Sequence, residues 1–433
     1  MDNLNKKVLI IAYSFPPAGG PGVQRTTKFV KYLRNYGWEP VVLTRDANNM
    51  PLKDETFLKD IPEGVRVIRT KAWDLTCGTG ITGLAGKFIA RKILIPDSER
   101  LWELFSRKVA EKAIENHDIQ VIYTTSLPYS SHLMGIHLKE KYPQISWVAD
   151  FRDEWTNNPY ILDNPYNPIR MNIEKRMEKR VLQTADYLIT NTPVMLKNFI
   201  EKNPDIPGLK DKFCVIPNGY DPDDFKQIKI HEPKNDKFTI TYTGSFYGRR
   251  KPDLFFDAIM ELIAENRINK EKICIKLIGN FKSDRIAQLL EERNLTGIVN
   301  IYPYMEHDEC VKNMVSSDCL LLIEGAGPGA EAFYTGKIFE YMVAARPILA
   351  MIPEKGAAAQ LIKETSTGLI SDCSDVETTK NNIVKLYTAW LNGTSIYNPN
   401  VNEIKKYERN NLTASLAKVF DHVLEKAVSK PID

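Results

Sequence analysis

Short apolar runs alternate with longer amphipathic stretches along most of the chain. In the first half, the apolar runs cover residues 8–13, 41–44, 65–69, 121–125, 145–149, 187–190 and 214–216. Most of these runs lack polar alternation, which is typical of parallel strands covered on both faces. Between them, residues 23–36, 101–116 and 170–185 have the apolar spacing of amphipathic helices. The pattern therefore predicts a series of βα units.

The same alternation begins again after a polar segment at residues 226–237, which is the best linker candidate. The apolar runs of this second series cover residues 239–243, 273–278, 299–302, 319–323 and 348–352. Repeated βα units form parallel sheets joined by right-handed crossovers. We therefore predict an α/β protein with two doubly wound, Rossmann-like domains that face each other across a cleft. A last amphipathic stretch, residues 407–427, predicts a terminal helix.

Composition and charge argue against several classes of protein. Lys and Arg number 58 and Asp and Glu number 55, so the net charge of +3 gives no strong field to attract nucleic acid. No apolar run is long enough for a transmembrane helix. The six cysteines form no Cys-x-x-Cys pair and the six histidines are scattered, which argues against a zinc site built from local spacing. These features favour a cytoplasmic protein with reduced thiols.

A glycine-rich loop follows the first predicted strand. In open α/β sheets, ligands bind beyond the carboxyl ends of the strands, so such a loop is a candidate site. Gly19, Gly20 and Gly22 allow close approach of the backbone to a ligand before a predicted helix. Arg25 occupies the position of the third glycine in the dinucleotide fingerprint, so a dinucleotide site is disfavoured. A loop that contacts a phosphate or sugar is favoured over a purely structural turn.

A cluster of charged side chains follows the strand predicted at residues 145–149. The segment Asp150-Phe-Arg-Asp-Glu-Trp155 holds three carboxylates and one arginine, which would perturb one another's protonation. Asp150 and Asp153 could bind sugar hydroxyls or act as a base. The alternative is a structural ion-pair network around Arg152. His132, which opens a predicted helix, is more typical of a cap or surface residue.

A metal site is not expected. Asp221 and Asp223 form a DxD pattern that can bind magnesium in other contexts. Here the pair lies in a Pro/Gly turn without further clustered oxygen ligands, and Asp221 can instead cap the short turn that ends at Phe225.

Two loops of the second half carry cations next to glycines. After its first strand, Gly244 and Gly248 precede the cations at residues 249–251. Lys337 opens a later helix, and Glu340 follows one turn on. A diphosphate bound without a metal needs such cations, and a carboxylate can accept both hydroxyls of a ribose. The alternatives are a solvated basic loop and a capping role for Glu340.

Taken together, five segments resemble glycosyltransferase family 4, the retaining family with the GT-B fold. The segments occur in the family's order and cover residues 14–22, 216–221, 242–245, 337–342 and 345–349. Residues 150–155 look like the variant of a bacterial surface-polysaccharide branch. The resemblance implies a first, acceptor-binding domain of residues 1–225 with a returning helix at about 405–433. It implies a second, nucleotide-sugar-binding domain of residues 226–404.

The resemblance also implies a reaction and a set of site residues. A sugar, of hexosyl type, would pass from a nucleotide diphosphate sugar such as a UDP-sugar to a glycan or lipid-linked acceptor, with retention and without a metal. This reaction belongs to cell-surface polysaccharide synthesis. Glu340 matches the family's ribose-binding glutamate, whereas Ala332 stands where the family has a second glutamate, with Glu331 beside it. Ser245 replaces the family's phosphate-binding arginine, so Arg249 and Arg250 become candidates for that role.

The predicted site combines these residues by role. The catalytic candidates are Asp150, Asp153, Arg250 and Lys337. The donor-binding candidates are Gly20, Gly22, Gly244, Ser245, Arg249, Arg250, Gly279, Glu331, Thr335, Gly336, Lys337 and Glu340.

Other functions and contacts stay open at this point. The chain could be a nucleotide-sugar epimerase of related fold, or a sugar-nucleotide-binding protein without turnover, since a fold does not guarantee a function. Residues 87–95, with Trp102 and Phe105 beyond them, mix cations and large apolar side chains. Such a stretch is typical of a helix at the inner face of a membrane, or of one that covers the domain's core.

Overall fold

The computed structural model describes residues 6–48, 50, 52–73, 93–226, 228, 235–281 and 283–428. The chain forms two compact units. The first comprises Met1–Pro217 and Arg409–Asp433, and the second comprises Asn218–Glu408. The sequence had suggested a boundary at residues 225–226 and a return of the chain at about residue 405.

The described part of the first unit contains a seven-stranded parallel sheet in the order β3-β2-β1-β4-β5-β6-β7. This order is that of a doubly wound sheet, with the switch point between β1 and β4. The strands are β1 (Lys6–Ile11), β2 (Trp38–Arg45), β3 (Arg66–Thr70), β4 (Val121–Thr125), β5 (Ser146–Phe151), β6 (Tyr187–Thr190) and β7 (Phe213–Val215).

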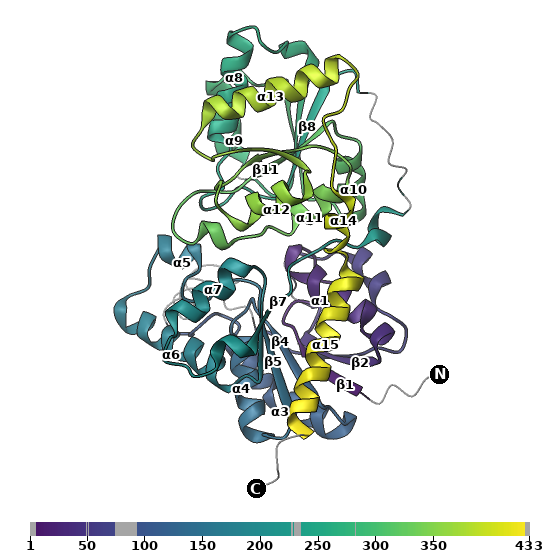
Figure 1. Cartoon of the computed structure of the whole chain (residues 1–433), viewed down its shortest axis with the longest axis vertical. Helices are drawn as coiled ribbons and strands as arrows, with labels where there is room; N and C mark the ends of the chain where they lie inside the picture. The colour runs from purple at the N-terminus through teal and green to yellow at the C-terminus, as the bar shows by residue number, and fades with distance from the viewer. Residues whose placement is uncertain are drawn as a thin grey trace. The chain divides into compact units, whose positions relative to one another are not determined.

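Helices cover both faces of this sheet. On one face, α1 and α15 pack side by side, and their apolar side chains Phe29, Leu416 and Phe420 join the core (Figure 1). The α-helices of the unit are α1 (Pro21–Leu33), α3 (Arg100–His117), α4 (Ser130–Lys141), α5 (Pro159–Asp163), α6 (Pro168–Thr184), α7 (Pro193–Lys202) and α15 (Arg409–Val428). Its 3₁₀ turns are η1 (Arg34–Tyr36), η2 (Glu55–Asp60) and η3 (Leu209–Lys212).

The described part of the second unit contains a six-stranded sheet in the order β10-β9-β8-β11-β12-β13, also parallel. The strands are β8 (Phe238–Thr243), β9 (Ile273–Ile278), β10 (Val299–Tyr302), β11 (Cys319–Ile323), β12 (Ile348–Met351) and β13 (Gly368–Ser371). The α-helices are α8 (Asp253–Ala264), α9 (Ser283–Glu292), α10 (His307–Val315), α11 (Lys337–Val343), α12 (Ala357–Thr365), α13 (Val376–Leu391) and α14 (Val401–Lys405). The 3₁₀ turns are η4 (Pro222–Phe225), η5 (Lys270–Lys272) and η6 (Ala330–Ala332).

Strand β11 shows why the strands lack polar alternation. Cys319, Leu321 and Ile323 pack into the core beneath α8, α9 and α13. Leu320 and Leu322 pack into a separate core beneath α10, α11 and α12. A strand buried on both faces needs apolar residues at every position. The prediction of two doubly wound parallel sheets is therefore confirmed.

The stretch predicted to touch a membrane or cover the core, residues 87–95, lies mostly outside the described residues. Of its two aromatic neighbours, Trp102 is buried and donates a 2.8 Å hydrogen bond from Nε1 to Thr70 Oγ1, so it does not face solvent. Phe105 is 63% exposed and contacts the ring of Trp73. Among the helices of the described ranges, none is long and apolar enough to cross a membrane.

Candidate functional site

Two glycines bring the loops after β8 and β9 together at the carboxyl edge of the second sheet. Gly244 has φ 122° and Gly279 has φ 150°. A Cβ atom on Gly279 would lie 2.0 Å from the Gly244 carbonyl oxygen, and one on Gly244 would lie 2.7 Å from Lys337 Nζ. Only glycine tolerates this backbone conformation and this approach. The two residues therefore create the space that the Lys337 side chain fills.

Lys337 presents a buried cation at this edge. It is the first residue of α11, and its Nζ lies 3.8 Å from the centre of the Tyr242 ring. Nζ is buried and has no hydrogen-bond partner in the described part of the chain. Burial lowers the pKa of the Lys337 ammonium well below its ordinary value, and the nearby Arg250 lowers it further. An anion at Nζ would supply the missing partner.

The two arginines of the loop after β8 have different surroundings. Arg249 donates a 2.9 Å hydrogen bond from Nη1 to the Pro328 carbonyl. Cβ atoms on Gly325 or Gly327 would collide with Arg249, so the glycine-rich loop packs directly on this side chain. Arg250 instead lies over the rings of Tyr247 and Phe333.

The charge of Arg250 affects the pKa values of two buried groups at this edge, Lys337 and Glu324. It lowers the pKa of Lys337, and it opposes the rise that burial causes in the pKa of Glu324. Of the two candidates for phosphate binding, Arg250 is thus placed near Lys337.

Glu340 is held by a histidine that the sequence analysis did not identify. Glu340 Oε1 lies 2.6 Å from Nε2 of His307, and both side chains are buried. His307 opens α10, whereas Glu340 lies in the first turn of α11. Thr335 and Gly336 come directly before α11, with Thr335 buried. No local motif marks His307, because the two helices meet only in the folded sheet.

Glu324 is a second buried carboxylate that the sequence analysis did not identify. It follows β11, and its backbone N–H donates a 3.0 Å hydrogen bond to the Met351 carbonyl. Burial raises the pKa of Glu324, an effect that Arg250, Thr335 and Lys337 partly oppose. The other carboxylate candidate near the site, Glu331, is exposed on η6.

The remaining donor-binding candidates have structural contacts. The Ser245 carbonyl accepts a 3.1 Å hydrogen bond from the Tyr242 hydroxyl, which fixes the loop after β8. In the first unit, Gly20 has φ 94° and is the N-cap of α1. The structure thus brings Gly244, Gly279, Arg250 and Lys337 together within the second unit.

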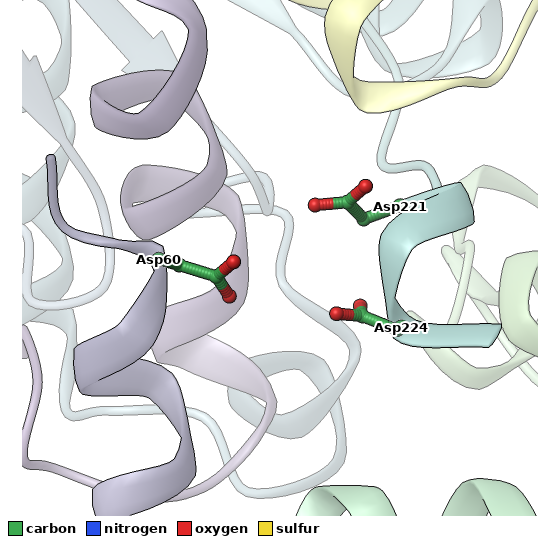
Figure 2. Close-up of side chains that lie close together, drawn as sticks. All are labelled: Asp60, Asp221 and Asp224. Carbon is green, nitrogen blue, oxygen red and sulfur yellow. The ribbon is translucent and has the colours of Figure 1, made fainter. Parts of the chain in front are cut away.

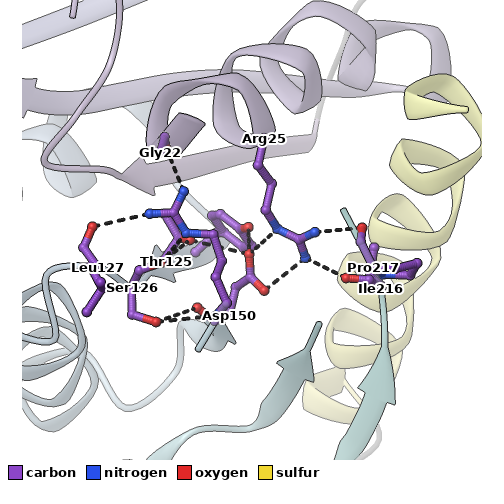
Figure 3. Close-up of polar contacts among 10 residues, drawn as sticks. Gly22, Arg25, Thr125, Ser126, Leu127, Asp150, Ile216 and Pro217 are labelled. Atoms are coloured by element: carbon purple, nitrogen blue, oxygen red, sulfur yellow. Dashed lines mark hydrogen bonds and ion pairs between the residues drawn. The ribbon is translucent and has the colours of Figure 1, made fainter. Parts of the chain in front are cut away.

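Asp150 forms a buried ion pair in the first unit (Figure 3). Arg25 donates from Nε to Oδ2 of Asp150 at 2.7 Å and from Nη2 to Oδ1 at 3.0 Å. The Tyr123 hydroxyl also donates to Oδ2. Arg25 further donates to the carbonyls of Ile216 and Pro217, both at 2.8 Å. The ion pair therefore joins β5 to α1 and to the segment after β7.

Arg152 binds backbone rather than Asp150, so the predicted ion-pair network has Arg25 at its centre. Arg152 donates from Nη1 to the Gly22 carbonyl at 2.5 Å and from Nη2 to the Leu127 carbonyl at 3.3 Å (Figure 3). Its Nε donates to the Ser126 carbonyl. These bonds tie the glycine-rich loop to the loop after β4. His132 is fully buried, with Nδ1 2.8 Å from Thr124 Oγ1, so the expectation of a surface position is wrong.

Two of the aspartates of the DxD region lie on one short turn. Asp221 and Asp224 both belong to the η4 region of the second unit, whereas Asp60 ends η2 of the first unit (Figure 2). Asp221 accepts a 3.0 Å hydrogen bond from the backbone N–H of Asp223, which is the predicted capping role. Asp60 forms ion pairs with Lys28 and Lys31 of α1, at 2.7 and 2.9 Å.

Glu154, in the same segment as Asp150 and Arg152, should make the stability of the protein depend on pH. Burial raises the pKa of Glu154 to about 7. The unfolded chain has an ordinary glutamate pKa of about 4.3, so the folded protein binds the extra proton between these values. The contribution of this group to stability is then greatest below about pH 4.3 and falls as the pH rises through about 7, by about 3–4 kcal/mol in total.

We expect Glu154→Gln to flatten the fall in melting temperature between pH 5 and pH 8. Thermal denaturation across that range measures it, with the exposed Glu271→Gln as the control. Equal slopes for the wild type and Glu154→Gln would contradict the assignment.

Comparisons with known proteins agree with this architecture. Residues 22–224 match the family described as Glycosyltransferase Family 4. A search of curated proteins finds no match. The matching solved structures include a sucrose-phosphate synthase from Thermosynechococcus elongatus, which is 14% identical, with a TM-score of 0.65 over 98% of this chain and 100% of that chain.

Two further structures show the same fold. WaaG, a glycosyltransferase involved in lipopolysaccharide biosynthesis, is 14% identical, with a TM-score of 0.57 over 96% of this chain and 95% of that chain. A trehalose-6-phosphate structure from E. coli bound with UDP-2-fluoro glucose is 14% identical, with a TM-score of 0.59 over 98% of both chains. At these identities the likeness concerns the fold.

Proposed function

We propose that this chain, of which residues 22–224 match Glycosyltransferase Family 4, is a glycosyltransferase of the GT-B type that transfers a hexosyl group with retention of configuration. The donor is a nucleotide diphosphate sugar, and the acceptor is a glycan or a lipid-linked sugar. The observation that carries the proposal is the buried Lys337 Nζ, which has no hydrogen-bond partner among the described residues and lies near Arg250 at the carboxyl edge of the second sheet.

The leaving group explains why cations gather at this edge. Transfer breaks the bond between the anomeric carbon and the diphosphate oxygen, which leaves negative charge on the diphosphate. Fixed positive groups that face this charge stabilise the transition state more than the ground state. Lys337 and Arg250 supply two such groups. The acceptor oxygen then bonds to the anomeric carbon, and the acceptor proton passes to the departing phosphate.

We propose that these two cations take the place of a metal ion. A diphosphate needs charge compensation, which Arg and Lys side chains can provide through charge-assisted hydrogen bonds. Activity should therefore persist in EDTA. The UDP-sugar in the E. coli structure with this fold supports a sugar nucleotide as donor, without specifying the base.

The first unit is proposed to bind the acceptor. Both oxygens of Asp150 are engaged by Arg25 and Tyr123, so its role is to hold the glycine-rich loop region in place. Asp153 is only partly buried, and we propose that it contacts the acceptor. The exposed pair of Trp73 and Phe105 supports a peripheral membrane contact near a lipid-linked acceptor. The lipopolysaccharide role of WaaG supports a function in surface-polysaccharide synthesis.

A panel of UDP-, GDP-, ADP- and dTDP-sugars tests the proposed reaction. Thermal shift identifies the donor, because a ligand that binds the folded state raises its apparent stability. Release of the nucleoside diphosphate that depends on an acceptor then shows transfer, and NMR of the product reports the anomeric configuration. Conversion of the donor sugar without an acceptor would instead indicate an epimerase. Binding without turnover would indicate a sugar-nucleotide-binding protein.

The two arginines after β8 form a matched pair for mutation. Arg250→Ala should lower kcat/KM by about 100-fold, since it removes one cation that faces the diphosphate. Arg249→Ala should lower the melting temperature, because Arg249 supports the 325–328 loop, and it should lower kcat/KM less than Arg250→Ala does. Steady-state kinetics and thermal denaturation of both variants measure this. The reverse order of effects on kcat/KM would assign the phosphate to Arg249.

A further inference from the structure

Glu324 presents a buried carboxylate oxygen that the proposed mechanism does not use. The residue is 5% exposed and lies directly after β11. Its Oε1 has no hydrogen-bond partner within the described residues. Buried polar atoms in folded proteins almost always have a partner, and an unsatisfied one costs about 1–3 kcal/mol. An oxygen of this kind points to a ligand that donates a hydrogen bond.

The surroundings of Glu324 indicate the chemistry of that ligand. Lys337, Arg250 and Thr335 are the groups that act on the Glu324 carboxylate. In the described part of the chain, Glu324 and Lys337 form no ion pair with each other, although Lys337 Nζ also lacks a partner. Because the two groups influence each other and each has an unsatisfied buried atom, a polar ligand that donates to Glu324 and accepts from Lys337 would satisfy both.

A phosphate alone would satisfy only one of these two atoms. It could accept from Lys337 Nζ, but its negative charge would be repelled by Glu324. A hydroxyl group donates to a carboxylate and also accepts from an ammonium. A sugar linked to a diphosphate offers both chemistries in one molecule, since its phosphates suit Lys337 and Arg250 and its hydroxyls suit Glu324.

The residues at the position where the family resemblance places a sugar-binding glutamate do not offer this contact. Ala332 is buried on η6 and has no polar side-chain atom. Glu331 is exposed on the same turn. Glu324, in contrast, is buried, and its Oε1 lacks a partner among the described residues.

We propose that Glu324 determines donor-sugar specificity by accepting a hydrogen bond from a hydroxyl of the transferred sugar. This inference rests on the proposed function, because it requires a sugar nucleotide at Lys337. A site built to bind a hydroxyl discriminates strongly against an analogue that lacks it, since the buried acceptor is then left unpaired. Deoxy-sugar donors that lack this hydroxyl should therefore be poor substrates.

The test compares a nucleotide sugar with its own nucleoside diphosphate. Calorimetry uses UDP and UDP-glucose. If the wild type does not bind these, it uses the nucleoside diphosphate and the nucleotide sugar of GDP, ADP or dTDP that the wild type does bind. Glu324→Gln, which is nearly isosteric, should raise the Kd of the nucleotide sugar about 10-fold, and Glu324→Leu more, because a charged acceptor is lost. The Kd of the nucleoside diphosphate should stay unchanged or fall, since a carboxylate near the diphosphate has been neutralised. Glu271→Gln, exposed on η5, is the matched control.

Each other outcome overturns the inference in a recognisable way. Unchanged sugar-nucleotide affinity in both variants would make Glu324 a bystander. An equal loss for sugar nucleotide and nucleoside diphosphate would assign it to the phosphates or to the fold. Loss of sugar preference in Glu331→Gln, with none in Glu324→Gln, would move the contact to Glu331. A wild type that binds no nucleoside diphosphate would overturn the proposed function as well, which separates that failure from the others.

Discussion

Replacing Lys337 with alanine is expected to lower kcat/KM about 1000-fold. The reason is that Nζ faces the charge that develops on the leaving diphosphate, and the removal of one such group typically costs 10²–10³-fold in rate. In the folded protein Nζ makes no hydrogen bond within the described ranges, so its removal breaks none there. Steady-state kinetics with the identified donor measure the loss, and Lys385→Ala, exposed on α13, is the control.

The protonation of Lys337 gives a second readout of the same contact. Burial lowers its pKa well below the ordinary value in the protein without ligand. A diphosphate beside Nζ favours the charged form and raises this pKa. Binding should then take up a proton at a pH between the two values, and calorimetry in buffers of different ionisation enthalpy detects that uptake. The uptake should vanish in Lys337→Ala. Proton uptake that persists in this variant would show that another group titrates, and full activity in the variant would remove Lys337 from the mechanism.

Replacing Glu340 with alanine is expected to weaken binding of the nucleotide sugar and of the nucleoside diphosphate alike, by about 100-fold. A buried carboxylate that accepts hydrogen bonds from two ribose hydroxyls contributes about 1.5–3 kcal/mol per bond. The ribose is common to both ligands, so the two affinities should fall together. This result would differ from that of Glu324→Gln, which is expected to affect only the sugar nucleotide. An unchanged Kd for both ligands would remove the ribose role of Glu340.

His307 should act on the ribose only through Glu340. Its Nε2 lies 2.6 Å from Glu340 Oε1 and orients the carboxylate. We expect His307→Ala to raise both Kd values about 10-fold, and the double variant with Glu340→Ala to bind no more weakly than Glu340→Ala alone. Such non-additivity is the mark of residues that act as a unit. Additive losses would mean that His307 contacts the ligand independently. Glu309→Ala, exposed on α10, is the control for this helix.

Most of the fold could be predicted because its strands are buried on both faces. The predicted runs 121–125, 187–190, 273–278, 299–302 and 319–323 coincide with strands β4, β6, β9, β10 and β11. Strand β13 was not predicted, since three of its four residues are only partly buried and it lies at an edge of the sheet. A short edge strand with one glycine leaves a weak apolar signal.

The site was predictable only where its residues are close in the sequence. Lys337 and Glu340 are one helical turn apart and follow a glycine-rich stretch, so a local pattern indicates them. Arg250 could not be separated from Arg249, because neighbouring side chains differ only in what packs on them. Glu324 has no motif of its own. Its importance comes from burial and from an oxygen that has no partner in the described ranges, and both are properties of the folded chain.

By itself, the sequence determined the two series of βα units and the loops in which ligand-binding groups could lie, because apolar periodicity and glycine are local signals of burial and of backbone freedom. The tertiary structure decided which charges meet. It paired Asp150 with Arg25, far apart in the chain, and His307 with Glu340. Among the residues that the structure describes, it also left Lys337 Nζ and Glu324 Oε1 without hydrogen-bond partners at the carboxyl edge of the second sheet. Electrostatic roles depend on distance and burial, and those are set only when distant segments pack together.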